Sequence, residues 1–415
     1  MNEWALVCVA VALLVHAAVS ARLQSTVVTQ AMVFVAFGLL IGNRVFVVVD
    51  AEAANSVVRI LAEATLTLVL FTDALGVDLK KLRRGSDVPI RLLGVGLPLT
   101  IVAGTVAGLA LLPQLDVWTA AALATMLAPT DAALGLPVVT NERLPSRIRQ
   151  GLNVESGLND GVCVPLLIIF LTIAQAEEGV GGVEPLRVIA EEVGFGLVGG
   201  LVAGALGAWV LRTFTARGWM SATWQQIASA ATALLAYTLA SGLGGSGFIA
   251  AFAAGIVFRL LARDRMEGTT SFAEEAGVLL NAATFLTFGA VLLGPALGEL
   301  GWRVGVYALL SITVVRMLPV ALAMLGTGMR RVTVGFVGWF GPRGLASIVF
   351  VLVLVEQSDL AESSLMLAVV TTTVVLSVYA HGLTAWPAAN RYADWYAAHA
   401  SGAEALRVSD AAANP

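Results

Sequence analysis

Apolar residues occur along this chain in long runs separated by short polar loops. A run of roughly 20 apolar residues crosses the hydrocarbon core of a membrane as a helix, and counting such runs predicts about thirteen spanning helices. Their approximate limits are 3–20, 27–43, 56–76, 89–112, 118–139, 147–175, 188–211, 220–241, 245–262, 272–297, 302–325, 332–355 and 363–384. From residue 386 to 415 the pattern predicts a short, Ala-rich cytoplasmic tail. The fold class expected is therefore an all-α polytopic membrane protein.

Composition supports this interpretation and excludes several function classes. The chain is 58% hydrophobic and only 13% charged, whereas soluble domains carry about 25% charged residues. A net charge of −4 spread over loops offers no basic patch for nucleic acid. The only lysines, Lys80 and Lys81, do not follow a glycine, so no phosphate-binding loop for a nucleotide is present. Cys8 and Cys163 lie in apolar runs and the histidines lack ligand spacing, so no cofactor is expected.

The loops alternate in charge along the chain. Cytoplasmic loops of membrane proteins are enriched in Lys and Arg. If the N-terminus lies outside, most of the 24 basic residues fall in inside loops, and acidic residues such as Glu177 and Glu178 fall outside. This alternation predicts an odd number of spans, an outside N-terminus and a cytoplasmic C-terminus. The expected location is the plasma membrane, the inner membrane of a bacterium.

Two spans carry residues that break a helix near its middle. Residues 128–131 read Ala-Pro-Thr-Asp, and residues 341–344 read Gly-Pro-Arg-Gly. Proline removes a backbone donor and clashes with the preceding turn, and an isolated proline such as Pro98 or Pro319 is typical of an ordinary kink. The two breaks, however, are seven spans apart and each contains an ionisable residue. Paired interrupted helices in corresponding positions indicate a transporter built on an inverted repeat.

Several ionisable residues lie within the predicted spans, where each costs about 2.5–3.5 kcal/mol on insertion scales. They are Glu63, Asp73, Asp131, Glu155, Asp160, Arg316 and Arg343. At that cost we expect each of them to be paired or to take part in transport.

The sixth span concentrates these polar groups. It contains two pairs spaced four residues apart, Glu155 with Asn159 and Ser156 with Asp160. Residues four apart share a helix face, so the helix presents two neighbouring polar stripes. A hydroxyl and a carboxylate are hard oxygen ligands that suit a small cation. Thr130 and Asp131 on the interrupted fifth span would add a hydroxyl, freed backbone carbonyls and a second carboxylate.

Glu155 and Arg343 are predicted to form a buried ion pair between spans six and twelve, because a lone intramembrane arginine would be uncompensated. Arg316 is a candidate member of the same network. Glu63 and Asp73 on span three are candidates for accessory roles, and both also fit a helix-packing face or a water-filled entrance. A glycine run from residue 196 to 207 has the spacing that lets membrane helices approach closely, within the bundle or in a dimer.

Taken together, the segments 128–131, 155–161 and 341–344 resemble the motifs of the NhaP-type monovalent cation–proton antiporter family, in the same order. The resemblance covers essentially the whole transmembrane region, placed at residues 1–385. It implies two crossed, interrupted helices in a core domain, a separate dimerisation domain, homodimers and an elevator-like movement. The core would cover approximately residues 89–175 and 302–384, and the dimerisation scaffold residues 1–76 and 188–297.

The resemblance also implies residue roles. Asp160 would be the main carboxylate for cation and proton, with Asp131, Ser156 and the backbone of Thr130 as further ligands. Asn159, at a position where electrogenic relatives carry a second Asp, implies electroneutral one-for-one exchange. The pairing of Glu155 with Arg343 would be structural. The family often carries a Glu near the end of span three, and whether Asp73 replaces it stays open.

These features predict a secondary transporter, not an enzyme, that exchanges a monovalent cation for H⁺ and serves pH homeostasis. Desolvation disfavours the charged form of a carboxylic acid, so proton and cation would compete for Asp160. Residue identity does not choose among Na⁺, K⁺ and Li⁺. The alternatives are a transporter of another solute, a passive cation channel and an intramembrane enzyme that uses Asp131 and Asp160. A channel would instead need rings of carbonyls or charges along a continuous path.

Overall fold

The computed structural model describes residues 3–23, 26–42, 51–76, 87–179, 184–262, 270–296, 298, 300–357 and 360–399. Within these ranges the chain is helical and contains no strand, which confirms the all-α prediction. The orientation was predicted from the charges of the loops, and parts of these loops lie outside the described residues. They contain Lys80, Lys81, Arg263 and Arg265. The end of the predicted tail, residues 400–415, also lies outside the described residues.

The helices agree closely with the predicted spans. They are α1 (Glu3–Leu23), α2 (Gln30–Ile41), α3 (Ala51–Gly76), α5 (Asp87–Arg91), η1 (Leu92–Gly96), α6 (Leu97–Leu111), α7 (Val117–Met126), α8 (Leu136–Val139), α9 (Ser146–Glu177), α10 (Pro185–Ala216), α11 (Ala222–Gly242), α12 (Gly247–Ala262), α13 (Ser271–Thr287), η3 (Phe288–Leu292), α14 (Leu293–Ala296), α15 (Trp302–Ile312), α16 (Val314–Ala323), α17 (Arg331–Trp339), α18 (Leu345–Gln357) and α19 (Ser363–His399). Each predicted span coincides with one of these helices or with a consecutive set of them.

Length and hydropathy separate these helices into two groups. Among the described residues, six helical stretches are long and apolar enough to cross a membrane: Val88–Leu111, Ser146–Glu177, Pro185–Ala216, Ser271–Leu292, Trp302–Ala323 and Ser363–His399. Five shorter apolar helices include Val117–Met126 and Leu345–Leu354. Those two are halves of the interrupted spans, which explains why neither is long enough to cross alone.

Both predicted interruptions are present. α7 ends at Met126, and irregular backbone and turns follow until α8 begins at Leu136. α17 ends at Trp339 and α18 begins at Leu345, with Pro342 in the gap. The two interruptions meet, because the backbone N–H of Asp131 donates to the carbonyl of Pro342 at 2.8 Å. Crossed, interrupted helices therefore lie at the centre of the fold.

Three features of the helices differ from the prediction. The second half of span five is only the single turn α8, because a proline, Pro137, and turns over residues 132–135 interrupt the helix. Span eleven has a further break at Thr313, which starts α16 just before Arg316. The final helix is also longer than expected, since α19 continues through Pro387 to His399. Residues 386–399 of the predicted tail are therefore helical.

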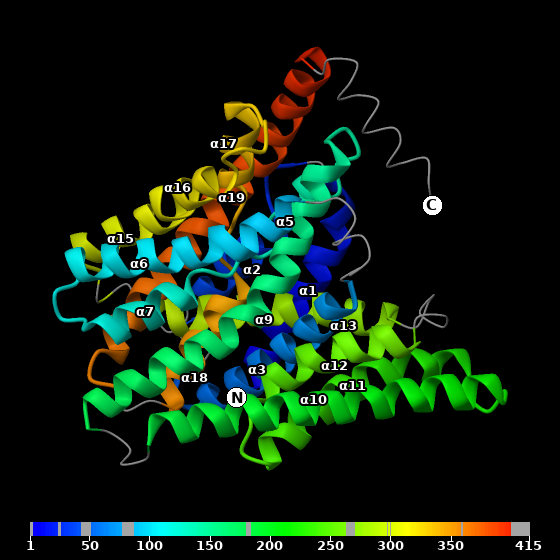
Figure 1. Ribbon diagram of the computed structural model, residues 1–415. Coiled ribbons are helices and arrows are strands. Elements are labelled where there is room, and N and C mark those ends of the chain that lie inside the picture. Colours follow the sequence, from blue (N-terminus) through cyan, green and yellow to red (C-terminus); the bar gives the residue numbers. More distant parts are fainter. Residues whose placement is uncertain are drawn as a thin grey trace.

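Glycines bring α10 close to α12. The two helices pack side by side next to α11 along one side of the bundle, opposite α6, α7, α15 and α16 (Figure 1). A methyl group at Gly200 would lie 2.8 Å from the Cβ of Ala253 and 3.0 Å from the Cα of Ala250. The small-residue spacing of α10 thus serves packing within this chain, as membrane helices commonly use it.

This contact predicts a destabilised Gly200→Ala variant. The added methyl must push α12 away, and overpacking of this kind costs about 1–3 kcal/mol. Thermal melting of the purified protein in detergent measures the effect. Gly194→Ala on the same helix is the matched control, because nothing lies within 4 Å of a methyl there. Equal melting of the two variants would contradict the packing described.

Candidate functional site

Four polar residues of α9 point into protein near the middle of the helix. Glu155, Ser156, Asn159 and Asp160 are each less than a tenth exposed. Their i, i+4 spacing places them on two adjacent faces of one helix, as expected from the sequence. Both polar stripes are therefore buried within the bundle.

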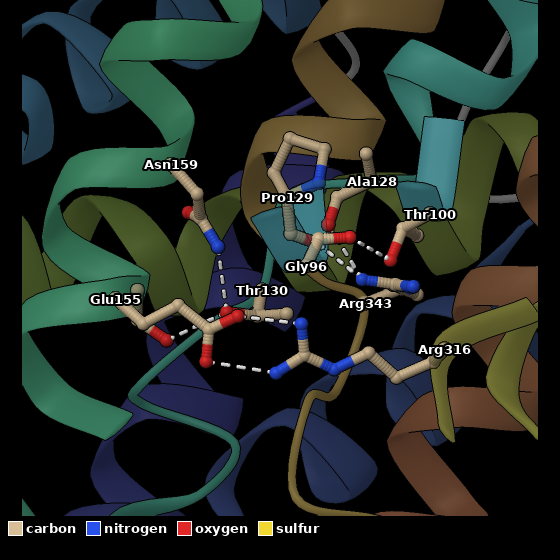
Figure 2. Close-up of polar contacts among 10 residues, drawn as sticks. Gly96, Thr100, Ala128, Pro129, Thr130, Glu155, Asn159, Arg316 and Arg343 are labelled. Carbon is tan, nitrogen blue, oxygen red and sulfur yellow. Dashed lines mark hydrogen bonds and ion pairs between the residues drawn. The ribbon is translucent and has the colours of Figure 1, made fainter. Parts of the chain in front are cut away.

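Thr130 joins the first interruption to α9. Its Oγ1 lies 2.9 Å from Oγ of Ser156 and accepts a hydrogen bond from Nδ2 of Asn159 at 2.7 Å (Figure 2). The side chain is buried. Thr130, Ser156 and Asn159 thus form one hydrogen-bonded group, as the predicted site requires.

Asp131 is bound by backbone donors of both interruptions. Its Oδ1 accepts from the N–H of Ala133 at 2.8 Å, and its Oδ2 accepts from the N–H of Leu345 at 3.1 Å. Leu345 is the first residue of α18, where unpaired N–H groups and the helix dipole favour a negative charge. A side chain at Gly344 would collide with the Asp131 carboxylate. Asp131 therefore caps the N-terminus of α18.

Arg343 makes the reciprocal contact. Its side chain is fully buried, and Nη1 donates to the carbonyls of Ala128 at 2.6 Å and Pro129 at 3.2 Å, just beyond the end of α7 (Figure 2). Ser347 adds a bond from its hydroxyl to the carbonyl of Met126 at 2.7 Å. A positive charge is favoured at the C-terminal end of a helix, so Arg343 stabilises α7 as Asp131 stabilises α18.

The predicted partner of Glu155 was wrong. Glu155 forms its ion pair with Arg316 of α16, with Nη1–Oε1 at 2.5 Å and Nη2–Oε2 at 2.8 Å (Figure 2). Both side chains are at most 2% exposed. Arg343 is instead occupied by the carbonyls after α7. Both arginines were possible partners of Glu155 from residue type alone. The break at Thr313 places Arg316 in the first turn of α16, next to Glu155.

Asp160 is the carboxylate that these contacts leave open. Its Oδ1 is buried and has no hydrogen-bond partner within the described chain, and the same holds for Oδ1 of Asn159. Asp73 and Asp131 are close enough to repel the negative charge of Asp160. Asp73 reaches this region from α3, since a side chain at Gly157 would lie 3.4 Å from its Cβ. Open buried oxygens beside like charges favour uptake of a positive ion.

Glu63 lies elsewhere, although it shares α3 with Asp73. It lines a cavity of about 480 Å³ together with Gln175 of α9 and Glu192 of α10. The cavity also reaches Val164, one turn along α9 from Asp160. Glu63 therefore matches the predicted water-filled entrance better than a direct place in the site.

Two residues near the site were not predicted from the sequence. Ser377 and His381 of α19 are buried and contact the second interruption. Their i, i+4 spacing within an apolar span was the signal available, but a buried serine and histidine commonly satisfy their own helix. Within the described ranges, no group of three His, Cys, Asp or Glu side chains is arranged to hold a metal ion.

The corrected ion pair predicts a specific energetic coupling. Removing one partner of a buried pair costs about 3–5 kcal/mol, because it leaves a charge uncompensated. Arg316→Met and Glu155→Gln should each lower the free energy of unfolding, and the double variant should lose much less than the sum. Arg343→Met combined with Glu155→Gln is the matched comparison, measured by thermal melting. A stronger coupling of Glu155 to Arg343 than to Arg316 would contradict the assignment.

Similar sequences are found among curated exchangers. A protein of Schizosaccharomyces pombe named as a probable Na⁺/H⁺ antiporter is 26% identical over 256 residues, which are 58% of this chain and 33% of that protein. Uncharacterized Na⁺/H⁺ exchangers of Mycobacterium bovis and Mycobacterium tuberculosis are 27% identical over 253 residues, 59% of this chain and 44% of theirs. The matches span less than half the length of these relatives.

Solved structures share the fold. The sodium proton antiporter MjNhaP1 from Methanocaldococcus jannaschii at pH 8 has a TM-score of 0.75 and 18% identity, over 92% of this chain and 99% of that one. An electron microscopy structure of the same antiporter gives a TM-score of 0.76 at 18% identity, over 97% and 99% of the two chains. The model of the family described as the transmembrane sodium/hydrogen exchanger matches residues 9–391. The chain therefore belongs to the sodium/hydrogen exchanger family and is an integral membrane protein.

Proposed function

We propose that this chain is a secondary antiporter that exchanges a monovalent cation for H⁺, with Asp160 as the group for which both compete. Membership of the exchanger family and the shared fold support cation–proton antiport in general. The observation that carries the assignment to Asp160 is its buried Oδ1 without a hydrogen-bond partner in the described chain. Buried polar atoms in native proteins are nearly always paired, so this oxygen suits an exchangeable occupant.

The occupant has to be positive. Asp73 and Asp131 repel a charged Asp160, and burial removes the water that would otherwise solvate it. A proton relieves both penalties by neutralising the carboxylate, and a cation relieves them by compensating the charge. The two cannot use the same oxygens at once. Competition at one carboxylate is therefore sufficient to couple the two ions, with no need for ATP.

Charge balance in the core supports one-for-one exchange. Arg316 is compensated by Glu155, and Arg343 and Asp131 add one charge of each sign, held at two opposed helix ends. With Asp73 protonated, Asp160 is then the remaining charge of this group. With a proton or with one monovalent cation the group is neutral, and an empty Asp160 leaves it negative. Moving a net charge through the membrane is costly, so only the two loaded forms would cross.

The proposed cation ligands surround the junction of α9 with the first interruption. They are Asp160, Ser156 and Asn159 from α9, and Thr130 with the nearby Asp131 from the interruption. The bonds of Thr130 to Ser156 and Asn159 hold two hydroxyl groups and the amide group of Asn159 close together. Asp73 is the proposed accessory carboxylate, and Glu155 with Arg316 the structural pair. Na⁺, K⁺ and Li⁺ all suit such oxygen ligands.

Alternating access would come from movement between two helix groups. We place approximately residues 89–175 and 302–384 in a moving core, and residues 1–76 and 188–297 in a scaffold that forms a homodimer. Contacts are consistent with this division, since α6 packs on α7 and α15, whereas α10, α11, α12 and α3 pack together. We further propose an outside N-terminus and a cytoplasmic C-terminus in the bacterial inner membrane.

The proposed role of Asp160 predicts the behaviour of Asp160→Asn, which keeps the shape of the side chain but removes the exchangeable charge. It should abolish cation-dependent proton movement while the purified protein melts within a few degrees of wild type. A pH-sensitive dye in everted vesicles, with Na⁺, K⁺ and Li⁺ added in turn, measures this and identifies the cation. Robust exchange by the folded variant would overturn the role of Asp160.

The second prediction concerns stoichiometry. Asn159→Asp adds a carboxylate next to Asp160, so the cation-loaded and proton-loaded forms should no longer carry equal charge. Exchange in proteoliposomes should then respond to an imposed membrane potential, whereas wild-type exchange should not. Asn159→Ala is the control, because it removes the amide without adding charge. A voltage response already present in the wild type would exclude electroneutral exchange.

A further inference from the structure

Ser377 and His381 form a polar pair within the long apolar helix α19. They are four residues apart, so they share a helix face, and both have 0% exposure. That face lies against the interruption between α17 and α18, because both side chains bond to its backbone. Nothing in the proposed exchange at Asp160 uses either residue directly.

The hydrogen bonds of this pair link α19 to both ends of the interruption. The backbone N–H of Arg343 donates to Oγ of Ser377 at 2.6 Å. Nε2 of His381 lies 3.0 Å from the carbonyl of Trp339, which can only accept, so this bond forms when Nε2 carries a proton. Nδ1 lies 3.1 Å from Oγ of Ser377 and 3.0 Å from the backbone carbonyl of Ser377, which also can only accept.

The two ends of this chain of bonds bracket the interruption. Trp339 is the last residue of α17, and Arg343 lies two residues before α18 begins. Irregular backbone at membrane depth persists only where its N–H and C=O groups are satisfied by protein or water. Ser377 and His381 supply partners at both ends, and the indole of Trp339 lies against the imidazole with ring centroids 4.9 Å apart. The segment 339–343 is thereby fixed to α19.

The same segment holds the ion site from its other side. Pro342 accepts the backbone N–H of Asp131, and the N–H of Leu345 donates to the Asp131 carboxylate. Thr130, the preceding residue, bonds to Ser156 and Asn159. A shift of the segment must therefore displace Asp131 and Thr130 relative to Asp160.

We propose that Ser377 and His381 are positioning residues for cation–proton exchange, which fix the second interruption so that Thr130 and Asp131 keep their places beside Asp160. This inference rests on the proposed function of Asp160. It adds a helix, α19, that contributes none of the proposed ligands. A misplacement of about 1 Å at a reacting or binding centre commonly costs large factors in rate, so the loss of one such bond should be visible in transport.

The transport test compares two hydroxyl deletions on the same helix. Ser377→Ala removes the acceptor of the Arg343 N–H. Thr373→Val is the matched control, because Thr373 is equally buried one turn away and its hydroxyl bonds only to Val369 of its own helix at 2.7 Å. In proteoliposomes, Ser377→Ala should raise the half-saturating Na⁺ concentration, or K⁺ if K⁺ is the cation carried, by at least about fivefold. Thr373→Val should change it less than about twofold.

Substitutions of His381 test its bond to the Trp339 carbonyl separately from its contact with Ser377, and a substitution of Ser377 tests for rescue. His381→Gln keeps a donor near the position of Nε2 for the Trp339 carbonyl. His381→Ala loses both this bond and the contact with Ser377. His381→Gln should therefore retain more of the wild-type cation affinity than His381→Ala. Ser377→Thr, which keeps the hydroxyl, should restore what Ser377→Ala loses. A purely structural role would move melting temperature and protein yield but leave the half-saturating concentration of the surviving protein unchanged.

A second readout does not depend on transport. Hydrogen–deuterium exchange of a peptide covering residues 340–345 should speed up in Ser377→Ala and stay at the wild-type rate in Thr373→Val. Equal deuterium uptake in the two variants, or equal half-saturating concentrations, would overturn the positioning role. Failure of the wild-type protein to exchange any cation for H⁺ would instead overturn the proposed function, and the deuterium result would still stand.

Discussion

The structure depends on satisfying backbone groups at two places where helices stop inside the membrane. Lipid offers no hydrogen bonds, so irregular backbone there is tolerated only when protein groups replace them. Here each interruption supplies partners for the other: Asp131 beside the first accepts the N–H of Leu345 at the start of α18, and Arg343 within the second donates to the carbonyls after α7. One negative and one positive side chain thus compensate two opposed helix ends.

This reciprocal arrangement determines what the neighbouring residues do. Because Asp131 and Arg343 each bond to the backbone of the opposite interruption, Glu155 pairs with Arg316, and Asp160 retains an open, buried oxygen. The carboxylates of the core consequently differ in role although they lie close together. A carboxylate with two backbone donors has its oxygens satisfied within the protein, whereas a buried carboxylate oxygen without such a donor is open to another partner.

Spans and breaks could be predicted from the sequence because they follow from hydropathy and from proline and glycine chemistry. The extent of α9, the breaks near Pro129 and Pro342, and the burial of Glu155 and Asp160 were all accessible in this way. The partner of Glu155 could not be predicted, because two buried arginines are the same residue type and only their positions in the fold distinguish them. The same limit hid Ser377 and His381: their value comes from the backbone opposite them, and sequence patterns describe only the helix to which they belong.

The cavity beside Glu63 shortens the distance between Asp160 and a space that can hold water. At about 480 Å³ and with polar side chains such as Gln175 and Glu192 among its apolar walls, it has room for many water molecules, each of which takes about 30 Å³ in the liquid. Val164 at its wall is four residues from Asp160, about 6 Å along a helix axis. On that side the insulating layer between Asp160 and a hydrated space is therefore one helical turn of packed side chains, far thinner than half a bilayer.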